Sequence, residues 1–384
     1  MKIMMVTSLP YEPAFGGANK ANRRIAEILA SRSNIVCALT LSNSQLTPRV
    51  KCASAPSMTN GVSRLCIGSV DVHEVSGPIV MLRDHFAKEV RAFGPDYILL
   101  SSEDSTQVLL AEAVTYNPSR VIYLAHTPNC LPFGPDSFYR SQKAASLLRE
   151  VKAVVAVSKF CAEYIRSWST IDPVQIYLPV YGSLPFPSYL NYSRGYITLV
   201  NPCRYKGIDI FLELARSFPT LHFAGVVSWG TTVADLERMS QLKNIVILQP
   251  DPDIDVILQQ TSVLLVPSLY LENFPMIIIE SMLRGIPVMA SNVGGIPEAK
   301  MNTGYIIDVQ PISAYTQIWD DRGLWIPIVP EQNCEPWRRA LTELQSNSIL
   351  YERESINGRA TAAGFVSSLS IEPLELLMQK SPLG

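Results

Sequence analysis

The chain has 384 residues, of which 47% are apolar and 17% are charged, and its formal net charge is −2. This length exceeds one ordinary core and suits two α/β domains of roughly 180 residues each, and the apolar content excludes global disorder. The near-neutral charge excludes a surface that attracts polyanions as a whole, so nucleic acid is not an expected partner.

The first half of the chain alternates short apolar runs with helical patterns. Strands are predicted at residues 3–6, 35–39, 97–100, 121–124 and 153–157. Helices are predicted at residues 22–30, 81–93, 106–113, 137–151 and 158–167. This alternation is typical of a parallel sheet covered on both faces, and it predicts one Rossmann-like domain over residues 1–180.

A second half of the same kind follows a proline-rich stretch at residues 181–194, which is predicted to be a linker. Strands are predicted at residues 196–200, 221–226, 245–248, 263–266, 287–290 and 305–307. Helices are predicted at residues 208–218, 336–345, 349–363 and 371–379, and residues 310–335 are predicted to be irregular. Residues 195–364 therefore form a second predicted Rossmann-like domain, and a C-terminal helix within 365–384 is predicted to pack back on the first.

The strongest chemical signal follows the predicted strand at residues 263–266. The chain continues with Glu272 in the run LENFPM, and Glu280 follows eight positions later. Pro275 fits the first turn of a helix, where its missing N–H costs nothing. A helix N-terminus at the carboxyl end of a strand favours an anion such as a sugar diphosphate. The two flanking carboxylates can accept hydrogen bonds from sugar hydroxyls.

These glutamates, with Phe-Pro between them, Gly-Ile-Pro-Val at 285–288 and Val-Gly-Gly-Ile-Pro-Glu at 293–298, closely resemble family 4 of the retaining glycosyltransferases. The resemblance is strong in the C-terminal half and moderate in the N-terminal half. It implies a GT-B fold, in which two Rossmann-like domains face each other across a cleft. It also implies that Glu272 contacts the hydroxyls of the donor sugar and that Glu280 holds the ribose. The backbone that it places near the transferred sugar and phosphate belongs to Asn273, Phe274, Pro275 and Met276.

Residues 201–207 form the second segment that the resemblance assigns to the donor. The family carries Gly-Arg, four residues and Lys-Gly, with the arginine and lysine on the diphosphate. Lys206 and Gly207 match this pattern, whereas Asn201 stands where the arginine belongs. Whether the nearby Arg204 replaces that charge stays open. Lys206 is the main candidate to stabilise the departing diphosphate.

Three smaller matches complete the set of candidate site residues. Gly16 and Gly17 follow the first strand, where glycine allows close backbone approach to a ligand or simply makes a turn. His126 follows the strand at 121–124, and the resemblance implies that it contacts the donor sugar. Gly294 and Gly295 either present N–H groups to phosphate or make a turn. The other histidines, His73, His85 and His222, are predicted to be structural or exposed.

The resemblance implies a hexosyltransferase-type enzyme with a nucleotide-diphosphate sugar as donor and no cofactor or metal. It leaves the acceptor open between a sugar, a lipid-linked sugar and a small-molecule natural product, and it implies transfer with retention of the anomeric configuration. Seven scattered cysteines indicate reduced thiols in a cytoplasmic protein, and membrane association is not favoured because no strongly basic amphipathic helix is visible. A non-catalytic partner or regulatory subunit of the same fold, which Asn201 favours, and a sugar-nucleotide epimerase stay open as alternatives. A Rossmann oxidoreductase is disfavoured because the dinucleotide-binding glycine fingerprint is missing.

Overall fold

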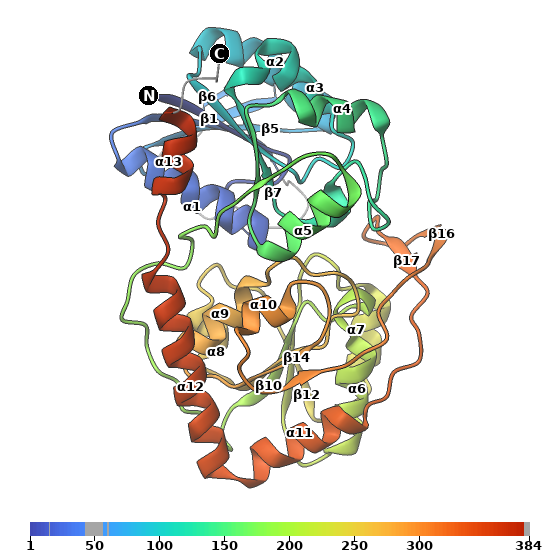
Figure 1. The fold of residues 1–384 in the computed structure, drawn as a ribbon. Helices are drawn as coiled ribbons and strands as arrows, with labels where there is room; N and C mark the ends of the chain where they lie inside the picture. The colour runs from blue at the N-terminus through green and yellow to red at the C-terminus, as the bar shows by residue number, and fades with distance from the viewer. Residues whose placement is uncertain (15, 43–56, 60, 380–384) are drawn as a thin grey trace. The chain divides into compact units, whose positions relative to one another are not determined.

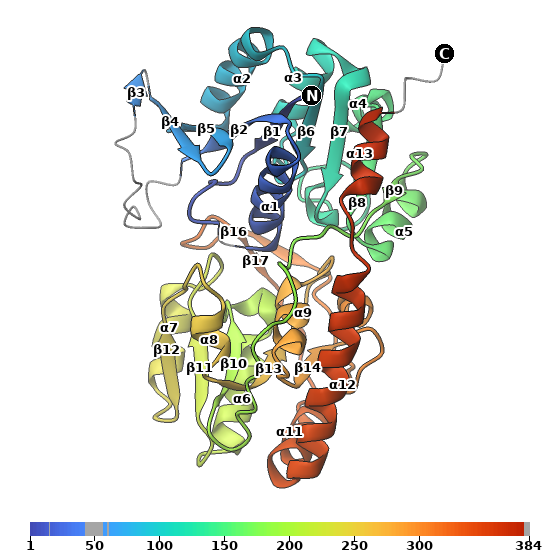
Figure 2. The ribbon, with the colours of Figure 1, turned by 90° about the vertical axis from the view of Figure 1, so that its left-hand side faces the viewer.

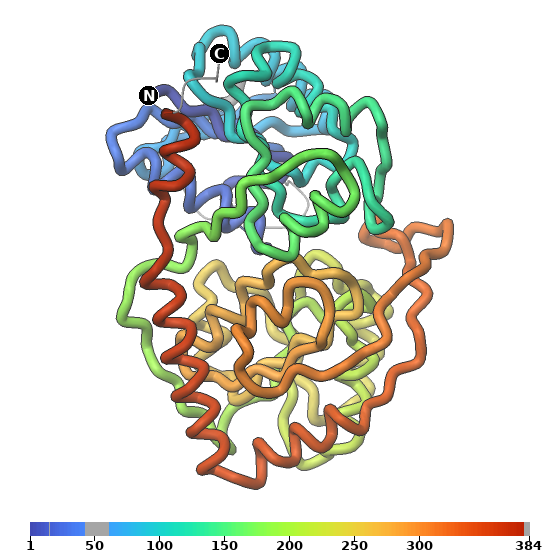
Figure 3. Tube along the Cα trace, in the orientation of Figure 1, coloured from blue at the N-terminus to red at the C-terminus, as the bar shows by residue number. Residues whose placement is uncertain are grey.

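The structure, a computed structural model, describes residues 1–14, 16–42, 57–59 and 61–379. The chain divides into two compact units: unit 1 comprises Met1–Val180 with Leu369–Gly384, and unit 2 comprises Tyr181–Ser368. Figure 1 shows the ribbon of each unit, and Figure 3 traces the path of the chain. Both units are mixed α/β, and each is described below on its own terms.

Unit 1 is built on a sheet whose described strands follow the order β3-β4-β5-β2-β1-β6-β7-β8-β9. In this order, the strands β5, β2, β1, β6, β7, β8 and β9 run parallel to one another. At the edge of the sheet, β4 pairs antiparallel with β5, and β3 pairs antiparallel with β4. They are β1 (Lys2–Thr7), β2 (Ile35–Leu41), β3 (Ser57–Thr59), β4 (Val62–Ile67), β5 (Val70–Val75), β6 (Tyr97–Ser101), β7 (Val121–Ala125), β8 (Ala153–Ala156) and β9 (Val174–Gln175). The chain winds outward in both directions from β1 and β6, which makes the edge between these strands the switch point of the sheet.

Helices cover both faces of this sheet. They are α1 (Gly17–Ser31), α2 (Ile79–Phe93), α3 (Val108–Tyr116), α4 (Gln142–Glu150), α5 (Lys159–Trp168) and α13 (Glu372–Gln379), with short 3₁₀ turns η1 (Pro118–Arg120) and η2 (Pro128–Cys130). Alternate residues of β1 are buried on opposite faces: Met5 packs in a cluster with α1 and α13, and Met4 in a cluster with α2, α3, α4 and α5. Figure 2 shows α1 in front of the sheet.

Unit 2 is built on a parallel sheet in the order β12-β11-β10-β13-β14-β15. Its strands are β10 (Tyr196–Val200), β11 (Phe223–Val226), β12 (Ile245–Leu248), β13 (Thr261–Val266), β14 (Val288–Ser291) and β15 (Ile306–Ile307). Counted along the chain this is 3-2-1-4-5-6, the order of a dinucleotide-binding sheet, with its switch point between β10 and β13.

The helices of unit 2 also cover both faces of their sheet. They are α6 (Ile208–Ser217), α7 (Val233–Ser240), α8 (Asp255–Leu258), α9 (Met276–Leu283), α10 (Ile296–Lys300), α11 (Glu335–Ser346) and α12 (Ser348–Ser367), with the 3₁₀ turn η3 (Arg204–Lys206). Buried side chains of α6, α7 and α11 pack in one cluster and those of α8, α9 and α10 in another. Helix α12 contributes to both, with Tyr351 in the first cluster and Ala362 in the second.

Two segments differ from their expected character. Residues 310–335, predicted to be irregular, contain the antiparallel hairpin β16 (Tyr315–Trp319) and β17 (Trp325–Pro327), in which the Trp319 and Trp325 rings stack with centroids 4.0 Å apart. The cross-strand stack of these two rings and the backbone hydrogen bonds from Asp320 N to Leu324 O and from Ile328 N to Ala314 O hold the hairpin, most of whose β16 residues are exposed. Residues 181–194, predicted to be a linker, belong to unit 2, where Tyr189 N donates to Arg284 O at 2.8 Å.

The C-terminal residues divide at the boundary between the units. Residues 365–367 end α12 in unit 2, whereas α13 packs Leu374 and Met378 into the unit 1 core. Residues 380–384 lie outside the described part of the chain. The described cysteines are free thiols, as expected, and Cys52 lies outside the described residues.

Candidate functional site

The principal candidate site lies at the carboxyl ends of β10 and β13 in unit 2. Open α/β sheets bind ligands in the crevice at the switch point, because the loops from the two strands diverge there. The loop after β10 ends at Gly207, which has φ 74° and lies against Pro267 of the loop after β13, so closely that a Cβ would overlap the Pro267 carbonyl oxygen. Glycine at this position therefore allows the two loops to meet.

Lys206 and Glu272 form an ion pair across these two loops. The Glu272 side chain is only 8% exposed and that of Lys206 17%. Lys206 Nζ also lies 3.4 Å from the Tyr270 hydroxyl and 5.0 Å from the centre of its ring. The structure thus brings together two of the residues predicted to be catalytic, and it pairs them as opposite charges with little solvent around them.

Two neighbours that the sequence analysis did not select hold the Glu272 carboxylate. Ser268 Oγ donates to Oε1 at 2.7 Å, and Tyr270 OH donates to Oε2 at 3.2 Å. Ser268 is fully buried, and its own carbonyl accepts a 2.7 Å hydrogen bond from Ser291 Oγ. These contacts fix both oxygens of the carboxylate, and hydroxyls in the few residues after a buried strand are the signal that could have identified them.

The loop after β14 holds the Glu272 backbone. Gly295 N donates to Glu272 O at 2.7 Å, and Gly294 has φ 57° with its Cα packed against the Glu272 peptide. The N–H of Gly295, one of the groups predicted to face phosphate, is used here within the protein. The glycine pair therefore makes a turn that positions Glu272, and a phosphate contact of the Gly294 N–H stays a prediction.

Two helix N-termini open at the same edge. Helix α6 begins at Ile208 directly after Lys206–Gly207, and α9 begins at Met276 with Pro275 as its N-cap residue. The helix dipole favours an anion at both N-termini. The N–H groups of Ile208, Ile210 and Ile278 already donate to backbone carbonyls, so the dipole and the remaining first-turn N–H groups would act on a ligand. Asn273, which is buried, and Phe274, whose ring lies 5.8 Å from that of Phe365, lead into α9.

Asn201 and Arg204 lie in the same loop as Lys206 but point elsewhere. Asn201 has φ 64°, and its Oδ1 accepts from Gly230 N at 2.9 Å, so the side chain braces the loop after β11. Asparagine tolerates this left-handed backbone, which gives a local reason for the residue at this position. The exposed Arg204 lines a cavity of about 170 Å³ whose wall also includes Asp235, Asp320 and Asp321. Those carboxylates favour a cation there and disfavour a phosphate.

Glu280 lies in α9, in the second of its two full turns. It is half-buried, and its charge contributes to the raised pKa of the nearby Tyr181, which burial raises most. Its backbone carbonyl accepts from Arg284 Nη1 at 3.1 Å.

Unit 1 carries a second polar cluster at the ends of β6 and β7. His126 Nε2 lies 2.8 Å from Asn22 Oδ1, and Asn22 Nδ2 donates to Ser101 Oγ at 2.9 Å. His126 N donates to Ser102 Oγ at 2.9 Å. Burial lowers the pKa of His126 to about 4, so the ring is neutral and donates from Nε2 to the amide oxygen. Sequence reasoning missed Asn22, although its place in the first helix after the glycine pair is a usable signal.

Glu103 and the glycine pair complete the carboxyl edge of the unit 1 sheet. Burial raises the pKa of Glu103, directly after β6, to about 7. Gly16, with φ 90°, is the N-cap of α1, and Gly17 is the first residue of that helix. Both glycines are exposed, and a Cβ on Gly16 would meet no atom within 4 Å, so Gly16 is required by its backbone conformation rather than by crowding.

Comparisons with known proteins agree with this architecture. Residues 195–318 match the family model of Glycosyl transferases group 1, which confirms the predicted resemblance over about a third of the chain. Sucrose-phosphate synthase from Thermosynechococcus elongatus is 17% identical with a TM-score of 0.69, over 98% of this chain and 97% of that one. HepE from Anabaena, in complex with UDP and glucose, is 16% identical with a TM-score of 0.69, over 99% and 100%. A glycosyltransferase from Rickettsia africae is 14% identical with a TM-score of 0.63, over 99% of each chain.

At these identities the likeness shows the fold: two Rossmann-like domains of GT-B type, as predicted. A search of curated protein sequences finds no match to the chain. Within the described ranges, no helix is both long enough and apolar enough to cross a membrane.

Proposed function

We propose that the chain is a glycosyltransferase that moves a sugar from a nucleotide-diphosphate sugar to an acceptor hydroxyl with retention of configuration. The observation that carries this proposal is the Lys206–Glu272 pair at the β10/β13 switch point, between the N-termini of α6 and α9. The family match over residues 195–318 and the likeness in fold to HepE in complex with UDP and glucose support it.

Charge and hydrogen-bonding capacity at this edge suit a sugar diphosphate. A diphosphate needs positive charge and N–H donors, which Lys206 and the two helix N-termini supply. A sugar needs acceptors for its hydroxyls, which the Glu272 carboxylate supplies. Because Lys206 has three N–H donors, it can keep contact with Glu272 while it donates to a phosphate oxygen.

In the proposed reaction, the acceptor oxygen attacks the anomeric carbon on the face from which the diphosphate leaves. The bond from the anomeric carbon to the diphosphate oxygen breaks, and that oxygen takes the proton of the acceptor hydroxyl. Lys206 and the helix N-termini stabilise the charge that develops on the leaving group, and no metal or cofactor takes part. Glu272 orients the sugar. Glu280 is assigned to the ribose by the resemblance alone.

Unit 1 is proposed to bind the acceptor. The edge between β1 and β6 is its own switch point, and the polar groups of Asn22, Glu103 and His126 lie there with the Gly16–Gly17 turn. His126 keeps the contact with the donor sugar that the resemblance implies, and as a neutral imidazole it can offer that sugar a hydrogen bond. A hexose is the proposed sugar, the acceptor a sugar, a lipid-linked sugar or a small molecule, and the cytoplasm the proposed compartment.

The experiment is a panel of UDP-, GDP-, ADP- and dTDP-sugars screened by thermal shift, followed by NMR of the product with the donor that binds. A ligand at about 100 times its Kd adds about 2.7 kcal/mol to stability, which gives a clear rise in melting temperature. The proposal expects one nucleotide class to bind and the product anomer to match the donor. An inverted anomer contradicts the retaining mechanism, and sugar conversion without acceptor identifies an epimerase. Donor binding without transfer to any acceptor identifies the non-catalytic alternative that Asn201 favours.

A further inference from the structure

A cluster of imidazoles and carboxylates lies in unit 1, on the sheet face that α2 covers. His73 comes from β5, whereas His85 and Glu89 lie one turn apart on α2. One ligand atom of each lies within 4.8 Å of the others. His73 Nδ1 is 3.1 Å from His85 Nε2 and 3.9 Å from Glu89 Oε2. Three ligating atoms from a strand and a helix therefore converge at one point.

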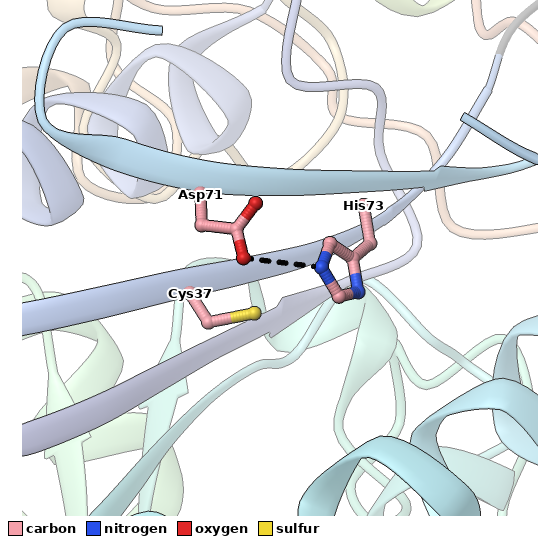
Figure 4. A group of neighbouring side chains, drawn as sticks. All are labelled: Cys37, Asp71 and His73. Atoms are coloured by element: carbon pink, nitrogen blue, oxygen red, sulfur yellow. Dashed lines mark hydrogen bonds and ion pairs between the residues drawn. The ribbon is translucent and has the colours of Figure 1, made fainter. Parts of the chain in front are cut away.

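Asp71 sets the tautomer of His73. Its Oδ2 lies 3.2 Å from His73 Nε2, and Figure 4 shows this contact between side chains that project from the same face of β5. With the proton on Nε2, the lone pair on Nδ1 faces His85 and Glu89. A carboxylate on the far nitrogen of a histidine is the outer arrangement found around most metal-binding histidines, because it fixes the ring and raises the basicity of the ligating nitrogen.

We propose that His73 Nδ1, His85 Nε2 and Glu89 Oε2 form a binding site for a divalent transition-metal ion of the zinc class. Zinc binds nitrogen and oxygen ligands at about 2.0–2.2 Å, and tetrahedral ligands at that bond length lie roughly 3.3 Å apart. The 3.1 Å and 3.9 Å separations from His73 Nδ1 bracket this value. Two histidines and one glutamate are a known zinc set that leaves one coordination position open.

Cys37 Sγ forms a second group of this kind with Asp71 and His73, and Figure 4 shows the three side chains together. In that group Asp71 Oδ2 already contacts His73 Nε2, at 3.2 Å. The set with His85 and Glu89 uses the other ring nitrogen of His73 and is therefore the one assigned.

Two positive side chains oppose an ion near His85, Arg64 more strongly and Lys88 less. Arg64 lies on β4 opposite His73, and its Nη2 is 3.0 Å from Glu89 Oε2. Its side chain is 55% exposed and can leave the carboxylate for solvent. An ion in the site would take the place of this contact and link α2 to β5, so that binding adds stability to the edge of the unit 1 sheet.

The test is a Zn²⁺ titration of the full-length chain without a histidine tag, stripped of metal by a chelator, against a chromophoric indicator. Wild type is expected to take up a single tightly held Zn²⁺ and to melt at a higher temperature with it. His85→Gln is expected to abolish that uptake. Asp71→Asn is expected to weaken it by about 10–100-fold, because it removes the outer carboxylate. His222→Gln, a histidine change in unit 2, is the matched control and is expected to change nothing.

Co²⁺ absorption identifies the ligands in wild type, so that the result does not depend on whether a variant folds. Nitrogen and oxygen ligands give visible ligand-field bands alone, and this spectrum supports the site. A thiolate charge-transfer band would show a cysteine ligand and overturn the proposed set, and its loss in Cys37→Ser would identify Cys37 as that ligand. Absence of Zn²⁺ uptake by wild type also overturns the proposal. So does wild-type uptake by both His85→Gln and Glu89→Gln. Arg64→Gln is expected to tighten binding because it removes the competing charge, and weaker binding contradicts that reasoning.

Discussion

Gly294 is the residue whose replacement tests most sharply how the Glu272 loop is held. A Cβ built on Gly294 would lie 3.0 Å from Glu272 N and closer still to Glu272 O. Gly323, in the turn of the β16–β17 hairpin, has a similar φ of 72°, and a Cβ there would meet no atom within 4 Å. Gly294→Ala and Gly323→Ala therefore share the backbone cost and differ in the collision with Glu272.

The loss of free energy of unfolding can be worked out for each of the two alanine variants. A non-glycine residue in the left-handed region costs about 1–2 kcal/mol, and both variants bear that cost. Gly294→Ala must also displace the Glu272 peptide and weaken its hydrogen bond from Gly295 N, at a further cost of about 0.5–1.5 kcal/mol. We expect Gly294→Ala to destabilise unit 2 by about 2–3 kcal/mol and Gly323→Ala by about 1–2 kcal/mol. Donor affinity should fall at least about tenfold in Gly294→Ala alone, since 1.4 kcal/mol corresponds to a factor of ten.

Urea unfolding followed by tryptophan fluorescence measures the first quantity. Four of the five tryptophans, at positions 229, 319, 325 and 337, belong to unit 2, so the signal reports mainly on that unit. Calorimetric titration with the donor found by thermal shift measures the second quantity. Equal destabilisation by the two variants, together with wild-type donor affinity in Gly294→Ala, would refute the reasoning.

Three further variants test the buried polar groups. Burial lowers the pKa of His126 from 6.5 to about 4, so the unfolded chain binds more protons than the folded chain between these pH values. The free energy of unfolding of unit 1 should therefore fall by up to about 3 kcal/mol as the pH falls from 6.5 to 4. His126→Gln should remove this pH dependence in urea unfolding. Burial raises the pKa of Glu103 from 4.5 to about 7, so the folded chain holds a proton that the unfolded chain has lost between these pH values. The free energy of unfolding should therefore fall as the pH rises from 4.5 to 7. Glu103→Gln should abolish this fall, and an unchanged pH dependence in that variant would contradict the raised pKa of Glu103. The buried Tyr351 OH donates to Ser262 O at 2.7 Å, so Tyr351→Phe should cost unit 2 about 1–3 kcal/mol, whereas a loss below about 0.5 kcal/mol would show that the carbonyl finds another donor.

Hydrophobic pattern was enough to predict the two central sheets. Every strand expected from the sequence is present within two residues of its bounds, because strands buried on both faces are continuous apolar runs. The strands β4 and β5 were missed for the converse reason. They lie at one side of the sheet and carry Arg64, Asp71 and His73 among their apolar residues, so no apolar run marks them. Helix α10, with five residues, is too short to show a period.

Site residues could be predicted where a motif along the chain contains them. Their contacts with residues from other strands and loops could not be predicted in this way. Lys206 and Glu272 were selected separately, and the structure pairs them. Their contacts with Ser268 and Tyr270 depend on the turn after β13, which apolar periodicity does not describe. His73 lies close to His85 and Glu89 because α2 packs on β5, so no local sequence motif predicts this cluster.

The central claim is that the Lys206–Glu272 pair binds the nucleotide sugar. Removing one partner of a buried ion pair costs about 3–5 kcal/mol because the other charge is left uncompensated, whereas replacing both by neutral groups of similar size is close to neutral. The most direct measurement is therefore donor affinity by calorimetry for wild type and for the double variant Lys206→Met, Glu272→Gln, with unfolding as the measure of stability. We expect the double variant to keep close to wild-type stability and to lose donor affinity by at least about 100-fold, or about 2.7 kcal/mol. Wild-type donor affinity in a stably folded double variant would contradict the claim.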